Sequence, residues 1–162
     1  LDWLNSPDED TPIMSHNLLK NKLLPKLKSG KPTFLLLMDC LRYDQWRVLQ
    51  PEFAKYFQIE EDTCYVSILP TATQYARNSI FAGLMPSEIE KRFPNKWLNE
   101  HEEGRKNDFE EDFVRDLLKR NGLGNIKVSY NKVTNLYKGK KLLEDFHQLM
   151  NNDLNIIVYN FA

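Results

Sequence analysis

The sequence is poor in the features that define several protein classes. Two cysteines among 162 residues are too few for a disulfide framework or a cysteine-based zinc site. The longest purely apolar run covers residues 34–38, whereas a membrane-spanning helix needs about 20 apolar residues. Lysine and arginine number 22 against 23 aspartates and glutamates, which excludes a polybasic protein that coats nucleic acid or membranes. The six glycines form no dinucleotide-binding or Walker A loop.

The composition that remains is that of a folded protein. Hydrophobic residues make up 41% of the chain and aromatic residues 12%, which is enough for an ordinary core. A secretory signal is not recognisable at the start, and the two thiols fit a reducing compartment, so we expect a cytoplasmic protein without membrane insertion. The chain opens on Leu1 rather than Met, and we therefore expect a piece of a longer protein.

The order of hydrophobic patterns predicts an α/β fold with a doubly wound, mostly parallel sheet flanked by helices. Residues 33–38 and 154–159 are almost continuously apolar, as in strands that are buried on both faces of a parallel sheet. Strand-like residues also occur at 57–69 and 126–130. Helical spacing predicts helices at 41–49 (ending at Pro51), 74–84, 109–118 and 138–150. We expect residues 1–30 to form a linker and a first helix that breaks near Pro25, and residues 31–162 to form one domain.

The first candidate functional residue directly follows the first predicted strand. Ligands of open α/β sheets bind beyond the carboxyl ends of the strands, and Asp39 occupies that position. Its carboxylate could bind a cation or accept a phosphoryl group. The equally weighted alternative is that Asp39 only caps the following helix.

The second candidate segment runs from Ile68 to Pro86 and contains a threonine-rich helix start. Unsatisfied backbone N–H groups and the positive end of the helix dipole suit a phosphate at such a position. A threonine hydroxyl there could act as a nucleophile; the alternative is that Thr71 or Thr73 only caps the helix. Arg77 and Asn78, one turn further on, could face either an anion or solvent.

The other polar residues are expected to be structural or exposed. The three histidines, His16, His101 and His147, have no partner at a metal-ligand spacing. Two acidic clusters, at 100–103 and 110–112, are expected to be solvated.

Taken together, these segments resemble the PglZ family of the alkaline phosphatase superfamily. Asp39-Cys-Leu-Arg-Tyr43 is similar to that family's Asp-Ala-Leu-Arg-Tyr signature. Pro70-Thr-Ala-Thr73 followed by Gly83-Leu-Met-Pro86 resembles the Pro-Thr-x-Thr … Gly-Leu-x-Pro pattern of the superfamily's phosphodiesterase branch. The sequences of residues 69–78 and 157–161 are similar to those of PglZ effector domains in response regulators that control type IX secretion in Bacteroidetes.

The resemblance implies a zinc-dependent phosphodiesterase that hydrolyses oligonucleotides, with two Zn²⁺ ions per complete domain. It implies that Asp39 is a zinc ligand and that Thr73 is the nucleophile that also contacts metal. The phosphodiesterase branch places an asparagine three residues after its threonine, where this chain has Ala76, so Arg77 or Asn78 is expected to bind the phosphate instead. The implied partners of the parent protein are secretion-system components, a sigma factor and a histidine kinase.

Two other functions remain open at this point. A zinc site needs at least three protein ligands, and the family's next aspartate and histidine are expected beyond residue 161, so this piece alone is expected to be metal-poor and inactive. The fold could then serve as a non-catalytic regulatory or protein-interaction module. A receiver domain with Asp39 as phosphoacceptor is a weaker alternative, because it gives the threonine-rich helix start no role.

Overall fold

The computed structural model describes residues 10–98, 104 and 106–160. The chain forms two compact units. We call Leu1–Ser29 with Tyr65–Asn125 the helical unit, and Gly30–Cys64 with Ile126–Ala162 the sheet unit. Each unit is interrupted in sequence, so segments that are far apart along the chain build each core.

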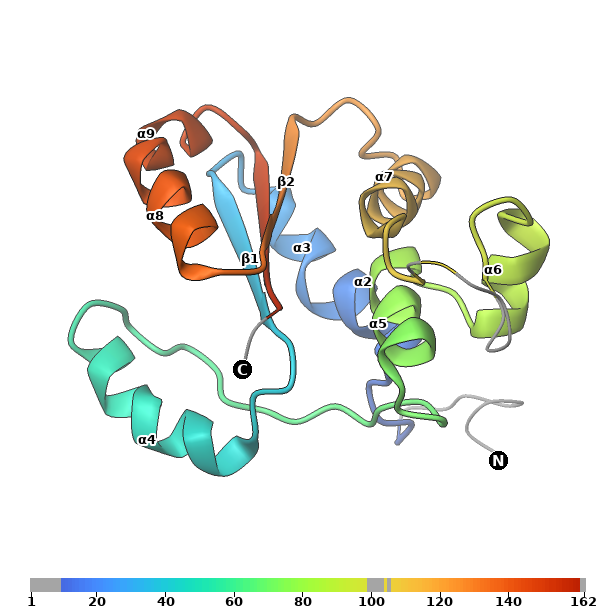
Figure 1. Ribbon diagram of the computed structural model, residues 1–162, viewed down its shortest axis with the longest axis horizontal. Helices are drawn as coiled ribbons and strands as arrows, with labels where there is room; N and C mark the ends of the chain where they lie inside the picture. Colours follow the sequence, from blue (N-terminus) through green and yellow to red (C-terminus); the bar gives the residue numbers. More distant parts are fainter. Residues whose placement is uncertain (1–9, 99–103, 105, 161–162) are drawn as a thin grey trace. The chain divides into compact units, whose positions relative to one another are not determined.

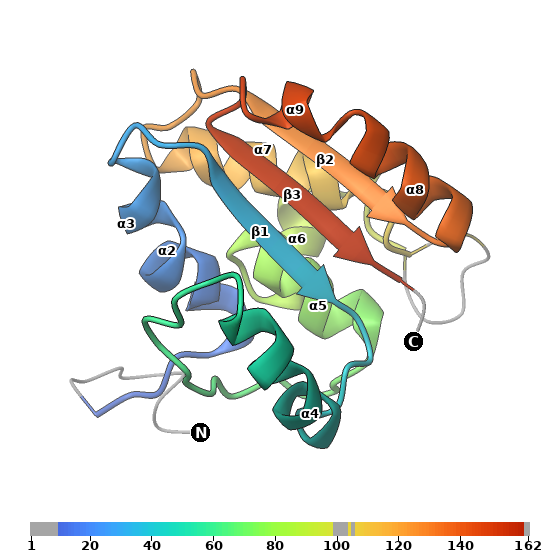
Figure 2. The ribbon, with the colours of Figure 1, turned by 90° about the vertical axis from the view of Figure 1, so that its left-hand side faces the viewer.

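The sheet unit contains three parallel strands, which point the same way in Figure 2: β1 (Thr33–Met38), β2 (Val128–Val133) and β3 (Leu154–Tyr159). Their order is β1-β3-β2, so β3 is central, and all of its residues except the last are buried. The strands predicted at 33–38 and 154–159 are confirmed, but the predicted burial on both faces holds for β3 alone of these two, because no residue of β1 is buried and its Leu36 is 46% exposed. The strand predicted at 126–130 forms two to three residues further on, at the edge of the sheet, where polar residues such as Lys132 are tolerated.

The three strands begin and end level with one another. Thr33 and Val128 both pair with Leu154, and Met38 and Val133 both pair with Tyr159. The chain therefore leaves all three strands along one straight carboxyl edge.

Helices α8 (Leu136–Glu144) and α9 (Phe146–Leu149) follow β2 and pack on one face of the sheet (Figure 1). Val133, Leu149 and Ile157 form the buried core of this packing. Phe34 of β1 stacks on Phe146, with ring centroids 5.3 Å apart. The single helix predicted at 138–150 is thus two shorter helices.

Helix α4 (Tyr43–Ala54) follows β1, and it does not stop at Pro51 as predicted. Pro51 lacks a backbone N–H and so removes one hydrogen bond of the helix, but residues 52–54 continue the helix. Phe53 also packs on Trp46, with ring centroids 5.6 Å apart, and this contact joins the turns on either side of Pro51.

The strand-like segment at 57–69 was predicted wrongly. Residues 58–65 contain no strand, and Val66 forms only an isolated bridge with Met14. Its N–H donates to the Ile13 carbonyl at 2.8 Å, and its carbonyl accepts from the Ser15 N–H at 3.2 Å. β-branched residues favour an extended backbone, but a strand also needs a partner along its length.

The helical unit is built around α5 (Thr73–Ala82) and α7 (Glu110–Arg120), which pack against each other. Phe81, Phe113, Val114 and Leu117 fill the contact and are at most 1% exposed. The first turn η1 (Ser15–Asn17) also packs on α5. Among its described residues the unit also contains helices α2 (Leu18–Lys22), α3 (Leu24–Leu27) and α6 (Pro86–Arg92). The predicted helix break near Pro25 is confirmed by the separation of α2 and α3.

These elements confirm the α/β class: the fold is a mixed α/β arrangement with a small three-stranded parallel sheet flanked by helices. Among the residues that the structure describes, the helices are too short or too polar to cross a lipid bilayer.

Candidate active site

Asp39 lies at the carboxyl edge of the sheet. Its N–H donates to the Tyr159 carbonyl at 2.9 Å, and the Asn160 N–H donates to the Val133 carbonyl at 2.9 Å. The backbone ladder thus continues one residue beyond the strands and holds Asp39 and Asn160 at the edge where open α/β sheets bind their ligands.

The local backbone shows that Asp39 does not cap the helix that follows it. Helix α4 begins at Tyr43 and its N-cap is Arg42, whose N–H donates to Gln45 Oε1 at 2.9 Å. The interpretation of Asp39 as the helix cap is therefore wrong. Cys40, the next residue, has a φ of 61°, which is uncommon outside glycine and is typical of functional turns.

Thr73 is the first residue of α5, and the N-cap is Ala72, which provides no side-chain cap. The interpretation of Thr71 or Thr73 as the cap is therefore wrong. The N–H groups of Tyr75 and Ala76 both donate to the Ala72 carbonyl, at 2.9 and 3.0 Å. The N–H groups of Thr73 and Gln74 belong to the first turn, where the helix supplies no carbonyl to accept from them. They lie at the positive end of the helix dipole. A half-buried hydroxyl thus lies where a helix favours an anion.

Arg77 and Asn78 point into the helical unit rather than into solvent. The Arg77 side chain is 5% exposed, and its guanidinium donates to the Glu110 carboxylate, which is fully buried. Asn78 is 2% exposed, and its Nδ2 donates to the Lys106 carbonyl at 3.0 Å. These contacts connect α5 to residues 106–110, which lead into α7. A contact of either side chain with substrate stays a prediction.

Asn107 is a residue of this site that sequence reasoning missed. Its Nδ2 lies 3.2 Å from the Thr73 carbonyl, 3.1 Å from Asn78 Oδ1 and 3.2 Å from Glu110 Oε1. It therefore links the first turn of α5 to the buried ion pair. Its sequence context, a charged stretch without hydrophobic periodicity, contained no signal for this role.

Glu110 is buried, and its expected solvation is wrong. It lies three, four and seven residues before Phe113, Val114 and Leu117, on the apolar stripe of α7. That spacing was the signal that could have placed it in the core. The predicted acidic residues at 100–103 lie outside the described residues.

His16 is half-buried in the first turn of the helical unit. Burial lowers the pKa of its imidazole, and the nearby charge of Glu88 opposes the shift only in part. His147 is exposed on α9, and His101 lies outside the described residues.

The structure gathers three of the four predicted site residues in one element. Thr73, Arg77 and Asn78 belong to α5 and share the Asn107 network, whereas Asp39 belongs to the sheet unit. Zinc needs at least three protein ligands. Within residues 10–98, 104 and 106–160, the histidine, cysteine, aspartate and glutamate side chains form no group of three that could hold a metal ion. The described residues therefore do not complete a metal centre.

Comparison with known protein families decides the family. A model described as the BREX system PglZ alkaline phosphatase-like domain matches residues 18–162. The chain belongs to the PglZ family. The match includes all three strands of this PglZ domain as well as Asp39 and Thr73. Proteins of the alkaline phosphatase-like superfamily generally use metal ions. A comparison with curated protein sequences gives no significant match.

Proposed function

We propose that this PglZ domain is part of a metal-dependent phosphodiesterase in which Thr73 is the nucleophile. The observation that supports the proposal most directly is the position of Thr73. Its hydroxyl lies on the first residue of a ten-residue helix whose capping position is filled by Ala72. The hydroxyl is therefore not needed as a cap.

The first turn of α5 supplies what an attacking hydroxyl at a phosphodiester requires from the protein. A phosphate held by the N–H groups of Thr73 and Gln74 would have its phosphorus close to the Thr73 side chain. Attack by Thr73 Oγ1 would form a new P–O bond while its hydroxyl proton passes to solvent, and the leaving oxygen would depart with the electrons of the broken P–O bond and take up a proton from solvent as an alcohol. Water would then hydrolyse the phosphate ester on Thr73, which releases a phosphomonoester and restores the Thr73 hydroxyl.

The buried network gives this turn a fixed position. Asn107 binds the Thr73 carbonyl and also contacts Asn78 and Glu110, which lie deeper in the helical unit. Pre-positioned groups save the entropy of ordering them during the reaction. We therefore propose that Asn107 acts as a positioning residue for Thr73, and that Arg77 and Asn78 support the phosphate-binding end of α5 from within the same buried network.

For the metal we propose Zn²⁺, with Asp39 and Thr73 among its ligands. Carboxylate and hydroxyl oxygens suit a hard or borderline divalent cation. The proposal requires ligands in addition to these two, and the described residues do not supply them.

For the biological role we propose an effector domain of a response regulator of the PorX type, which controls type IX secretion. The substrate would be an oligonucleotide, and the parent protein's partners would be secretion-system components, a sigma factor and a histidine kinase. The support is the similarity of residues 69–78 and 157–161 to such domains. Cys40 and Cys64 are free and exposed, which supports the proposed cytoplasmic location.

The decisive experiment measures hydrolysis of a short oligonucleotide and of bis(p-nitrophenyl) phosphate by the full-length protein with added zinc. Thr73→Ala should lower kcat by about a thousandfold or more, because it removes the nucleophile. Thr73→Ser should retain measurable activity, because it keeps a hydroxyl at the same position.

Thr71→Ala is the matched control, since Thr71 is exposed and precedes the helix. It should stay within about threefold of the unmodified protein. Undiminished hydrolysis by Thr73→Ala would remove Thr73 from the mechanism. Absence of hydrolysis by the unmodified, zinc-loaded protein would favour the non-catalytic interaction module.

A further inference from the structure

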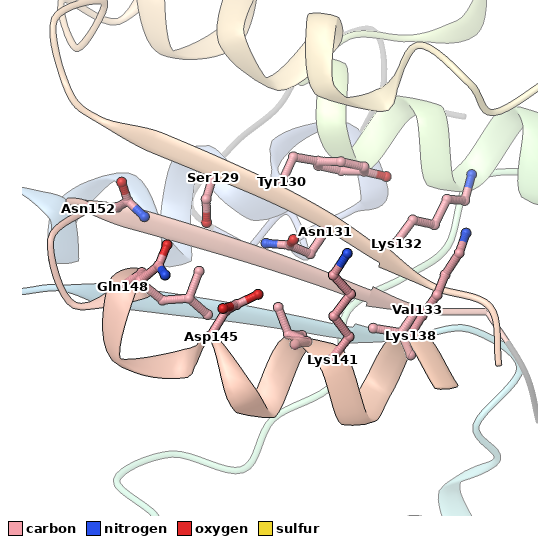
Figure 3. Close-up of a pocket in the computed structure, with 12 residues that line it drawn as sticks. Ser129, Tyr130, Asn131, Lys132, Val133, Lys138, Lys141, Asp145, Gln148 and Asn152 are labelled. Carbon is pink, nitrogen blue, oxygen red and sulfur yellow. The ribbon is translucent and has the colours of Figure 1, made fainter. Parts of the chain in front are cut away.

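A groove of about 570 Å³ lies in the sheet unit between strand β2 and helices α8 and α9 (Figure 3). One wall consists of residues 129–133, and the other is formed by side chains from Lys138 to Asn152. Pockets that hold nucleotide-sized molecules measure about 300–1,000 Å³. The groove includes neither Asp39 nor any residue of α5, so it is separate from the groups that the proposed hydrolysis uses.

Positive charge is concentrated around this groove. Residues 126–143 contain five lysines and no acidic residue, in a chain whose net charge is −1. Three of these lysines, Lys132, Lys138 and Lys141, line the groove. Within the part of the chain that the structure describes, neither Lys138 nor Lys141 forms an ion pair. Neither ammonium group is therefore neutralised by a direct ion pair there, and three lysines outnumber the one carboxylate of the lining, Asp145, which favours an anionic ligand.

The groove changes in character along its length. Lys132 and Lys138 lie together at the end where β2 finishes, and Lys141 projects from the middle of the helix wall (Figure 3). Asp145, Gln148 and Asn152 lie towards the opposite end, with Ser129 across from them. One end thus offers cations, and the other offers amide, hydroxyl and carboxylate groups.

The polar end is held in place by a buried asparagine. Asn155 of β3 is fully buried, and its Oδ1 accepts from Ser129 Oγ at 2.7 Å and from Asn152 Nδ2 at 3.0 Å. Its own Nδ2 donates to the Leu149 carbonyl at 2.8 Å. Because Asn155 orients one group of each wall, Ser129 and Asn152, these two groups are held in place before any ligand binds.

We propose that this groove binds a nucleoside diphosphate. The two phosphates would lie against Lys132, Lys138 and Lys141, since ammonium groups bind phosphate as point charges. The sugar and base would lie against the amides of Gln148 and Asn152, where Asp145 accepts a hydrogen bond from a ribose hydroxyl. Inorganic phosphate would use the lysine end only, and a nucleoside would use the polar end only.

The test is a calorimetric titration of ADP into the Thr73→Ala chain, which keeps hydrolysis out of the measurement. We expect saturable binding of one ADP per chain, weakened by salt because exposed charges are screened. Lys138→Gln and Lys141→Gln should each raise Kd by about five- to tenfold, the effect of one lost phosphate contact. Adenosine and inorganic phosphate should each bind at least about tenfold more weakly than ADP.

Lys140→Gln is the matched control, because Lys140 is an exposed lysine of the same helix that does not line the groove. It removes the same charge and should leave Kd within about twofold. The proposal is overturned if ADP gives no binding at about millimolar concentration. It is also overturned if Lys140→Gln weakens binding as much as Lys138→Gln, or if inorganic phosphate binds as tightly as ADP. None of these outcomes depends on Thr73 being a nucleophile, so this proposal and the proposed hydrolysis can fail separately.

Discussion

Arg77 and Glu110 form an ion pair inside the core of the helical unit, with side chains that are 5% and 0% exposed. A buried pair contributes little net stability, because desolvation offsets its attraction, but removing one partner leaves a charge without compensation. We expect Arg77→Met to destabilise the chain by about 3–5 kcal/mol in urea unfolding monitored by circular dichroism.

Arg115→Met is the control for this prediction. Arg115 pairs with Glu111 on the exposed side of α7, with side chains 48% and 44% exposed, and its loss should cost less than about 0.5 kcal/mol. The double variant Arg77→Met with Glu110→Met should recover most of the stability lost in the single variant. A double variant no more stable than Arg77→Met would contradict the uncompensated-charge explanation.

Gly83 ends α5 with a φ of 61°, and a methyl group there would meet Leu117 Cδ1 at 2.6 Å. Leu117 is only 1% exposed, so its side chain has little room to move away. We expect Gly83→Ala to destabilise the chain by about 2–4 kcal/mol, from backbone strain and overpacking together.

Gly122→Ala separates these two causes, because Gly122 also has a positive φ, 77°, but open space around its Cβ position. This variant should lose only the strain, about 1–2 kcal/mol. Equal losses at both glycines, measured by thermal unfolding, would show that the contact with Leu117 does not matter.

His16 makes stability depend on pH near neutrality. Burial lowers the pKa of its imidazole in the folded chain, so between the folded and unfolded pKa values the unfolded chain binds more protons. The contribution of neutral His16 to the unfolding free energy is therefore complete above its pKa in the unfolded chain, about 6.5, and is lost as pH falls below that pKa. We expect His16→Gln to flatten the decrease of unfolding free energy from about pH 7 to pH 5.

His147→Gln tests whether the effect belongs to His16, because His147 is the exposed histidine of the described chain. It should retain the decrease of unfolding free energy that His16 causes between about pH 7 and pH 5. A pH dependence in His16→Gln as steep as in the unmodified chain would disprove the role of burial at this position.

Asp116 of α7 binds two arginines, Arg92 of α6 and Arg120 of its own helix. Arg92 donates to both of its oxygens at 2.8 and 2.7 Å, and Arg120 Nε donates to Oδ2 at 2.7 Å. Desolvation alone would raise the pKa of Asp116, but the hydrogen bonds and charges of Arg92 and Arg120 outweigh it and hold the pKa below its usual value.

A carboxyl whose pKa is lowered by folding stabilises the fold at pH values above its pKa in the unfolded chain. This contribution is lost as pH falls through its pKa in the folded chain. We expect Asp116→Asn to lower stability at pH 7 by about 1–2 kcal/mol and to weaken the loss of stability below about pH 4. Asp112→Asn, at an exposed pair with Lys96, should cost less than about 1 kcal/mol. Chemical unfolding at several pH values checks both, and equal effects at the two aspartates would refute the prediction.

The strands were predictable where the sequence contains an almost continuous apolar run. The apolar runs at 33–38 and 154–159 form the two adjacent strands β1 and β3, and neither pattern has a helical period. Residues 57–69 have similar β propensity, but strand formation depends on a partner segment that the local sequence does not reveal. Helix α4 passes Pro51 for a related reason, because the contact of Trp46 with Phe53 depends on side chains seven residues apart.

The positions of Asp39 and Thr73 were predictable because each is marked by a local sequence pattern. Asp39 directly follows a strand, and Thr73 begins a helix. The surroundings of Arg77 were not, since its partner Glu110 comes 33 residues later. Asn107 was missed because its contacts with Thr73, Asn78 and Glu110 exist only once α5 and α7 pack together.

The level ends of the three strands have an evolutionary consequence. The ladder hydrogen bonds of this sheet end at Asp39 and Asn160, so changes of length or residue type in the segments beyond leave the strand register intact. Substitutions at this edge therefore need not change the hydrogen bonds between the strands. Divergence among relatives of this chain should therefore concentrate after residue 133 and beyond the signature that ends at Tyr43, where a PglZ domain can change its loops and keep its sheet.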